Sequence, residues 1–263
     1  MSHIIVIANQ KGGVGKTTTA VNLSACIATT GKSTLLVDLD PQGNSTSGIG
    51  IDKKELEASL YDVVVSEISK KDNATSEISA ENVILETQIE NLWILPSEKN
   101  LAGAEVELVN VPQREFCLRN ILAPIQDEYD YIFIDAPPSL SLLTINGLAA
   151  AQSVLIPLQC EYFALEGLSE LLQTIILVRD SLNNALRLQG VLLTMFQLTN
   201  LSKQVIDDVR DHLGDKVFDT VIPRNVTLGE APSFGMPIIE YDRACAGALA
   251  YSRLADELIE RNG

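Results

Sequence analysis

The 263-residue sequence predicts an α/β protein built as a single-domain, doubly wound, mostly parallel sheet flanked by helices. Short apolar runs rich in Val, Ile and Leu recur along the chain, and longer stretches of helical period separate them. Hydrophobic residues make up 46% of the chain, which is enough to fill a core, and no linker divides it. We therefore expect one domain spanning residues 1–263.

The strands are predicted where the apolar runs are nearly continuous, as in strands buried on both faces. They cover residues 3–8, 34–39, 92–96, 131–135, 153–157, 190–195 and 217–222. Helices are predicted between them, where apolar residues recur at three- and four-residue spacing, over residues 17–29, 163–182, 202–213 and 244–260. Residues 52–90 are acidic, Ser-rich and weakly periodic, so we expect surface helices and loops there.

Charge and cysteine usage limit the classes of partner. The net charge of -16 predicts a surface that repels nucleic acid and anionic lipid and favours a basic partner. The apolar runs are too short to cross a bilayer and no signal peptide is evident, so we expect a cytoplasmic protein without a membrane partner. The four cysteines form no C-x-x-C pair, and we expect them to be small buried side chains: Cys26, Cys117, Cys160 and Cys245.

The stretch NQKGGVGKTTT, residues 9–19, lies between the first predicted strand and the first predicted helix. Its glycines permit the backbone to turn successive amides toward one point, where the helix N-terminus adds its dipole. That context predicts a phosphate-binding loop in which Lys16 reaches the β- and γ-phosphates of ATP and the Thr17 hydroxyl binds Mg²⁺. The predicted nucleotide-binding residues of the loop are Lys11, Gly12, Gly13, Val14, Gly15, Lys16, Thr17 and Thr18.

Two other glycine-loop patterns do not fit. A dinucleotide-binding G-x-G-x-x-G that starts at Gly13 requires glycine where Thr18 stands. The ordinary G-x-x-x-x-G-K-[ST] loop requires glycine where Gln10 stands. Lys11 directly follows Gln10, the residue that does not fit the ordinary pattern. This indicates a variant loop with a second lysine.

Two further strands end in carboxylates. The run LLVDLDPQGN places Asp38 and Asp40 at the end of the strand over residues 34–39, and YDYIFIDAPPSL places Asp135 at the end of another. Ligands bind at the carboxyl ends of strands in open α/β sheets. A single acid that ends a buried strand beside a magnesium site suits a metal-binding carboxylate.

The loop KGGVGKTT resembles the deviant Walker A loop of the ParA and MinD group of P-loop ATPases. The runs DLDPQGN, CEYFALEGL and PRNV are similar to the ParA branch in particular. The resemblance implies that Lys11 reaches across a dimer interface to the partner's nucleotide, that Asp40 positions the attacking water and that Asp135 binds the metal. It also implies that Pro223 and Asn225 contact adenine. The predicted catalytic residues are then Lys11, Lys16 and Asp40, and the predicted metal-binding residues are Thr17, Asp40 and Asp135.

The function implied by the resemblance is an ATPase that forms a homodimer on binding ATP. Its hydrolysis would drive chromosome or plasmid partition with a ParB-like protein that offers a basic peptide. Basic residues with which this branch contacts nonspecific DNA are replaced here by Leu198, Thr227 and Ala246. Two hypotheses follow. Either a replacement patch binds DNA, from Lys203, Arg210, Arg224 or Arg243, or the chain is an ATP-gated protein-positioning scaffold that has lost DNA binding.

Relatives with other functions fit less well. A membrane regulator such as MinD needs a basic amphipathic terminal helix, whereas the tail YSRLADELIERNG is net acidic. An iron–sulfur protein of this group needs two cysteines per subunit at strand ends, and Cys117 and Cys160 lie outside the ends of the predicted strands.

Overall fold

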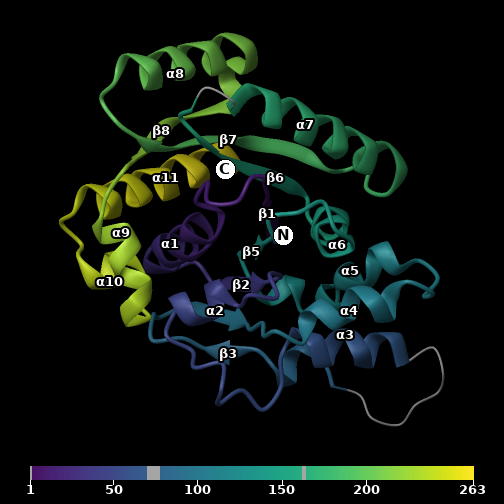
Figure 1. The fold of residues 1–263 in the computed structure, drawn as a ribbon. Coiled ribbons are helices and arrows are strands. Elements are labelled where there is room, and N and C mark those ends of the chain that lie inside the picture. The colour runs from purple at the N-terminus through teal and green to yellow at the C-terminus, as the bar shows by residue number, and fades with distance from the viewer. Residues whose placement is uncertain (1, 70–77, 162–163) are drawn as a thin grey trace.

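A computed structural model describes residues 2–69, 78–161 and 164–263. Its strands form one eight-stranded sheet in the order β3-β4-β2-β5-β1-β6-β7-β8 (Figure 1). All neighbouring strands run parallel except β3, which is antiparallel to β4. The strands are β1 (His3–Ile7), β2 (Thr34–Asp38), β3 (Leu85–Glu86), β4 (Leu92–Leu95), β5 (Tyr131–Asp135), β6 (Ser153–Gln159), β7 (Arg187–Phe196) and β8 (Val217–Pro223).

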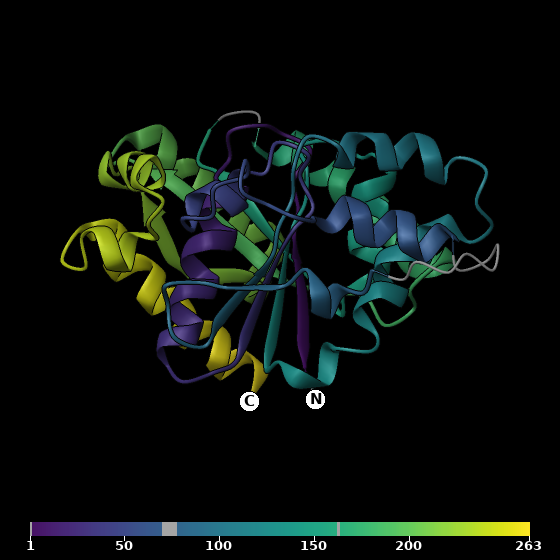
Figure 2. The same cartoon turned by 90° about the horizontal axis from the view of Figure 1, so that it is seen from below.

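Helices cover both faces of the sheet, as Figures 1 and 2 show. One face packs against α1 (Lys16–Thr29), α10 (Ile238–Tyr241) and α11 (Ala246–Asn262). The other packs against α3 (Leu60–Ser69), α4 (Leu101–Leu108), α5 (Cys117–Leu122), α6 (Leu142–Ala150), α7 (Ala164–Ser181) and α8 (Asn200–Leu213). Two short helices, α2 (Asn44–Gly48) and α9 (Thr227–Glu230), complete the set. Because both faces are covered, β2 and β5 are buried along their whole length.

Every predicted strand is present, but the map of residues 52–90 needs correction. Strand β3 was not predicted, because two residues carry no periodic signal. Helix α3 buries Leu60, Val63 and Val64 in the core, so it is more than a surface helix. Residues 70–77, and residue 163 of the helix predicted over 163–182, lie outside the described residues.

The two edges of the sheet differ. At one edge β3 is only two residues long. At the other, the backbone amides of Asp219 and Thr220 in β8 donate to the carboxylate of Glu257 on α11, at 2.8 and 2.9 Å. Both edges therefore leave few backbone groups for another strand.

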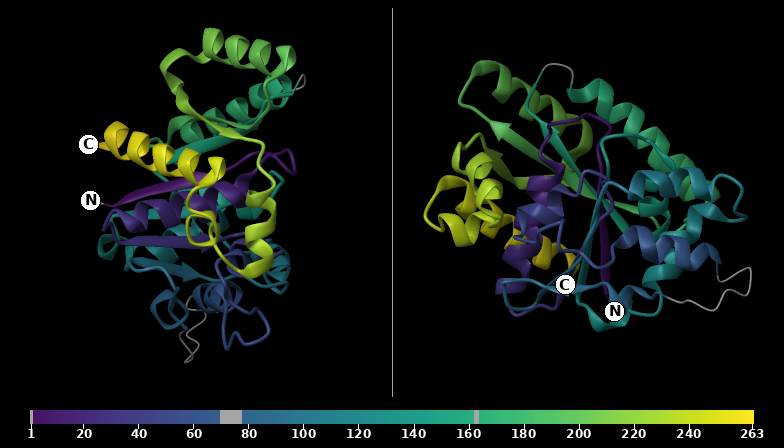
Figure 3. Two further views of the ribbon diagram at one scale, coloured as in Figure 1. Left: turned by 90° about the vertical axis from the view of Figure 1, so that its left-hand side faces the viewer. Right: turned by 60° about the horizontal axis from the view of Figure 1, so that its bottom comes forward.

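The strands share a direction that separates two ends of the molecule. Both chain termini lie close together at the end where β1 begins (Figures 2 and 3). The carboxyl ends of the parallel strands, where ligands bind in such sheets, lie at the opposite end. Among the described residues, no helix is long and apolar enough to span a bilayer.

Candidate functional site

The glycine loop leaves the carboxyl end of β1 and enters α1. Gly13 and Gly15 have φ angles of 74° and 90°, a left-handed conformation that side chains other than glycine rarely adopt. A β-carbon at Gly12 or Gly13 would meet no atom within 4 Å, so the space over the loop is open. Thr194 Oγ1 donates to Val14 O at 2.9 Å and anchors the loop to β7. The loop therefore has the shape of an anion cradle at a helix N-terminus.

The two lysines of the loop are directed to different groups. The Lys16 ammonium is buried and donates to Lys11 O at 3.1 Å. Burial lowers the pKa of Lys16, and the nearby Asp135 and Asp40 carboxylates oppose that shift. Lys11 Nζ instead donates to Glu161 Oε2 at 2.8 Å, and both side chains are about half exposed. One cation thus faces the carboxylates of its own subunit and the other faces the surface.

Asp38 and Asp135 lie side by side, since their strands pair in register at these residues. Both are fully buried. Asp135 Oδ2 accepts from Ser45 Oγ at 2.7 Å, while its Oδ1 has no hydrogen-bond partner among the described residues. Asp38 Oδ2 accepts from the backbone N and the hydroxyl of Thr46 at 2.8 and 2.7 Å. Asp38 is thus held by the protein, whereas Asp135 keeps one oxygen free.

Burial raises the pKa of Asp135 to about 7, and the neighbouring Asp38 carboxylate adds to the rise. Hydrogen bonds from the Ser45 and Thr17 hydroxyls oppose it. Burial likewise raises the pKa of Asp38 to about 6. The cluster therefore holds more negative charge than Lys16 balances, and a cation would relieve it. The free oxygen of Asp135 and the hydroxyl of Thr17 are hard oxygen donors, which fits Mg²⁺.

Asp40 lies on the loop after β2 and is 7% exposed. Its Oδ1 accepts from Gln42 N at 2.9 Å, and its carbonyl accepts from Ser97 Oγ at 2.8 Å. Its own backbone N donates to Asp38 Oδ1 at 3.2 Å. These bonds fix the Asp40 loop against the carboxylate cluster.

A cavity of about 250 Å³ adjoins the loop and is lined by Gly15, Thr18, Pro223 and Asn225, among others. The structure thus brings the predicted adenine-contacting residues to the predicted phosphate loop. Asn225 Oδ1 accepts from Leu228 N at 3.2 Å, which fixes the turn into α9. A second cavity of about 330 Å³, lined by Thr17, Thr18, Asn44 and Ser47, lies alongside.

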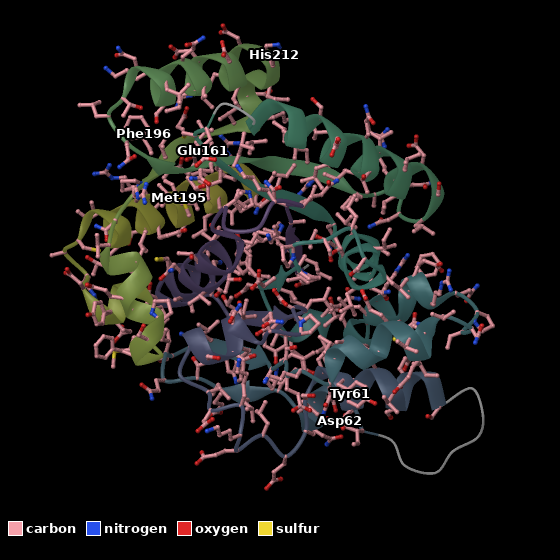
Figure 4. The ribbon with its side chains drawn as sticks, viewed as in Figure 1. Tyr61, Asp62, Glu161, Met195, Phe196 and His212 are labelled. Atoms are coloured by element: carbon pink, nitrogen blue, oxygen red, sulfur yellow. The ribbon has the colours of Figure 1, made fainter. Side chains whose placement is uncertain are left out.

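Several residues of the site carried no signal in the sequence. Met195 lines the 250 Å³ cavity with a φ of 54°, an uncommon conformation for a side chain other than glycine. Figure 4 labels Met195 and Glu161 in the part of the molecule formed by β6, β7 and β8, far from Tyr61 on α3. Glu161 lies in a run quoted for its resemblance, but nothing local indicated its pairing with Lys11.

The position predicted for Cys160 was wrong. Strand β6 extends to Gln159, so Cys160 directly follows a strand end. Burial raises the pKa of its thiol to about 11, which disfavours the thiolate that binds metals.

Of the positions discussed for DNA binding, Leu198 follows the end of β7, Thr227 begins α9 after β8, and Ala246 begins α11. Leu198 is 81% exposed and Ala246 is also exposed. Both positions are therefore accessible to a ligand, but neither carries the basic side chain that the family has there. Arg210 contacts Asp219 O near the start of β8, whereas Arg224 follows its end. Five residues of strand separate these points by about 16 Å. Arg210 and Arg224 therefore do not lie in one compact patch.

Comparison with known proteins places the chain in a family. The model of a family described as AAA domain matches residues 2–188. The chain is 54% identical to the sporulation initiation inhibitor protein Soj of Bacillus subtilis, over 98% of both chains. The chain belongs to the ParA/Soj family. It is also 50% identical to the chromosome-partitioning ATPase Soj of Treponema pallidum, over 100% of this chain and 99% of that one.

A solved structure supports the fold assignment. Cobyrinic acid a,c-diamide synthase from Mycobacterium smegmatis, with bound ADP and magnesium, is 35% identical, with a TM-score of 0.83 over 99% of this chain and 95% of that one. This likeness confirms the predicted α/β fold.

Proposed function

We propose that this chain is a magnesium-dependent ATP hydrolase of chromosome or plasmid partition that dimerises on binding ATP. The observation that carries the proposal is the divergence of the two lysines: Lys16 faces the buried carboxylates, while Lys11 is presented at the surface on Glu161. A loop that served only its own nucleotide would have no use for a cation directed outward. The relatives named as chromosome-partitioning proteins support the same conclusion.

The loop would hold the nucleotide through its backbone amides and Lys16. The glycines turn the amides of residues 12–18 toward the open space, where an anion gains from the helix N-terminus as well. Lys16 would leave Lys11 O and donate to the terminal phosphates. Pro223 and Asn225 would contact the adenine, since they line the cavity next to Thr18.

A bound magnesium ion would supply charge neutralisation for the phosphates. Thr17 and Asp135 would hold it, because the Asp135 Oδ1 atom is buried and has no partner among the described residues. Asp40 lies beside them and would orient the attacking water and contact the metal from the loop after β2. Asp38 would keep the Asp40 loop in place through its bond from Asp40 N.

Lys11 would complete the site of a second subunit. Its ammonium can approach the partner's phosphates from the open side and stabilise the charge that develops during hydrolysis, as an arginine finger does. Binding of ATP then favours the dimer, and hydrolysis removes the contacts that hold it. A ParB-like protein with a basic peptide is the partner that suits the net charge of -16.

An ATP-gated positioning scaffold without DNA binding is the second candidate. The exposed Leu198 and Ala246, and the partly buried Thr227, favour it because none of them neutralises a phosphate.

Size-exclusion chromatography with light scattering, with and without ATP and magnesium, tests the proposal. We expect a dimer that depends on ATP and that persists in Asp40→Ala, which binds but does not hydrolyse. A chain that stays monomeric with saturating ATP, or that binds no ATP in calorimetry, would overturn it.

A further inference from the structure

A cavity of about 730 Å³ lies at the opposite end of the sheet from the phosphate loop. It is formed where β7 and β8 begin and where α8 and α11 end, and we call it the β7–β8 cavity. Arg187 begins β7, and Thr194 near the end of the same strand contacts the glycine loop. Seven residues of strand separate these positions by about 23 Å. The β7–β8 cavity is therefore a separate place from the nucleotide site.

The lining of this cavity has the opposite charge balance to the rest of the chain. Its ionisable lining residues are four cations and two acids, Arg187, Arg210, Lys216 and Arg261 with Asp215 and Asp219. The whole chain carries 19 Lys and Arg against 35 Asp and Glu. A local excess of cations in a concave site attracts anions even where the overall charge is negative.

One of the four cations, Arg261, forms hydrogen bonds that stabilise the wall of the cavity. Arg261 donates to Val217 O at 2.8 Å and to Glu257 Oε1 at 2.7 Å, and its guanidinium lies 4.3 Å from the centre of the Phe218 ring. These contacts join the end of α11 to the start of β8. The wall of the cavity is thus preformed.

The other three cations keep most of their hydrogen-bonding capacity. The Arg187 guanidinium makes no hydrogen bond or ion pair with any residue in the described part of the chain. Arg210 makes one long contact, 3.4 Å to Asp219 O. Lys216 lies 3.9 Å from Asp215, whose side chain is 89% exposed. Donors without strong partners that line the same cavity are suited to an anion with several oxygen acceptors.

We propose that the β7–β8 cavity binds small organic phosphates that carry two phosphate groups. Guanidinium groups match phosphate oxygens in pairs, and Lys216 adds a point charge. The volume is in the range of small-molecule sites, about 300–1,000 Å³. A small ligand fits better than a nucleic acid because the surrounding acidic surface repels an extended polyanion, whereas a compact anion meets a lining with four cations and two acids.

Calorimetry on the protein saturated with magnesium and ADP tests the proposal, since the phosphate loop is then occupied. Fructose 1,6-bisphosphate is the probe, at low ionic strength, and orthophosphate is the single-phosphate comparison. We expect a dissociation constant below about 1 mM for the bisphosphate and binding at least about tenfold weaker for orthophosphate.

The double variant Arg187→Gln, Lys216→Gln should bind the bisphosphate about tenfold more weakly than the wild type. The matched control is Arg179→Gln, Lys203→Gln, which removes the same charge from exposed positions outside the cavity and should change binding less than twofold. Each single cavity variant is measured as well, so that one misfolded protein does not decide the outcome.

Three results would overturn the proposal. One is an absence of heat with the bisphosphate on wild-type protein. Another is an equal loss of binding in the control variant, which would indicate general charge attraction. The third is binding of a short DNA duplex that the cavity variant abolishes, which would assign the cations to a nucleic acid. None of these results depends on whether ATP hydrolysis or dimerisation occurs as proposed.

Discussion

Lys11 and Glu161 lie 150 residues apart in the sequence, yet Lys11 Nζ donates to Glu161 Oε2 at 2.8 Å. Gln159 Nε2 donates to the other carboxylate oxygen at 2.6 Å and fixes Glu161 at the end of β6. The second lysine of the loop is therefore held by an ion pair within its own subunit, and a dimer that uses Lys11 must break that pair.

Glu161→Gln should strengthen ATP-dependent dimerisation by about 1.4- to fivefold for each ion pair broken. An exposed ion pair contributes about 0.2–1 kcal/mol, and this variant removes that competing interaction. Sedimentation equilibrium with a non-hydrolysable ATP analogue measures the effect, and Glu170→Gln, at an exposed position on α7, is the matched loss of charge. A loss of dimerisation in Glu161→Gln as severe as that in Lys11→Ala would mean instead that Glu161 positions the lysine for the partner.

Substitution of Lys16 and of Lys11 should impair different steps, ATP binding in the first case and dimerisation in the second. Lys16→Ala should weaken ATP binding by about 100-fold or more, because it deletes a buried cation that would contact the phosphates. Lys11→Ala should bind ATP within about threefold of wild type but neither dimerise nor hydrolyse. Calorimetry followed by a phosphate-release assay separates the two, and Lys32→Ala at an exposed turn serves as the control. Equal loss of ATP affinity in both variants would contradict separate roles.

The carboxylate cluster predicts an unusual pH dependence in metal-free protein. The pKa of Asp135 is about 7 in the fold, far above its ordinary value of 3.8, so protonation favours the folded state. The free energy of unfolding should therefore fall as pH rises from 3.8 toward 7, because the buried carboxyl group ionises. Above pH 7 the destabilisation by this group reaches its full value.

Asp135→Asn removes that cost, because the amide carries no charge to desolvate. In EDTA, the gain in Tm of Asp135→Asn over wild type should grow between pH 5 and pH 8. With magnesium and ADP, the order should reverse, because the variant loses a metal-binding oxygen. Asp207→Asn, at an exposed position on α8, is the control. A difference in Tm that stays constant with pH would disprove the assigned ionisation.

Basic residues introduced at the positions where the family carries them should raise the affinity of this chain for DNA. Thr227→Arg with Ala246→Arg should strengthen ATP-dependent binding of nonspecific DNA and steepen its salt dependence by about one unit per phosphate contact. Filter binding across a salt series measures both quantities, with Val106→Arg at another exposed site as the control. Tight binding by the unmodified chain, unchanged by these variants, would show that other residues already bind DNA.

Much of the fold and of the site was predictable because the signals are local. The glycine loop, Lys16 and Thr17 lie within a few residues of one another, and Asp135 ends an apolar strand that periodicity alone predicts. Their convergence follows from the general rule that parallel strands present their carboxyl ends at one edge.

The remaining features depend on contacts between distant segments. The pairing of Lys11 with Glu161 and the bond from Ser45 to Asp135, 90 residues away, exist only once the sheet is assembled. The burial of α3 depends on which helices lie beside it, which a Ser-rich amphipathic segment does not reveal. The left-handed conformation of Met195 has no sequence signal, since methionine does not favour it.

The short β3 and the capping of β8 by Glu257 restrict how copies of this chain can associate. In the described part of the chain, β3 is only two residues long and two amides of β8 are already bonded to Glu257, which disfavours strand exchange and fibre growth at these edges. The dimerisation proposed above would instead use the surface around the glycine loop, where it would respond to a nucleotide and be reversible.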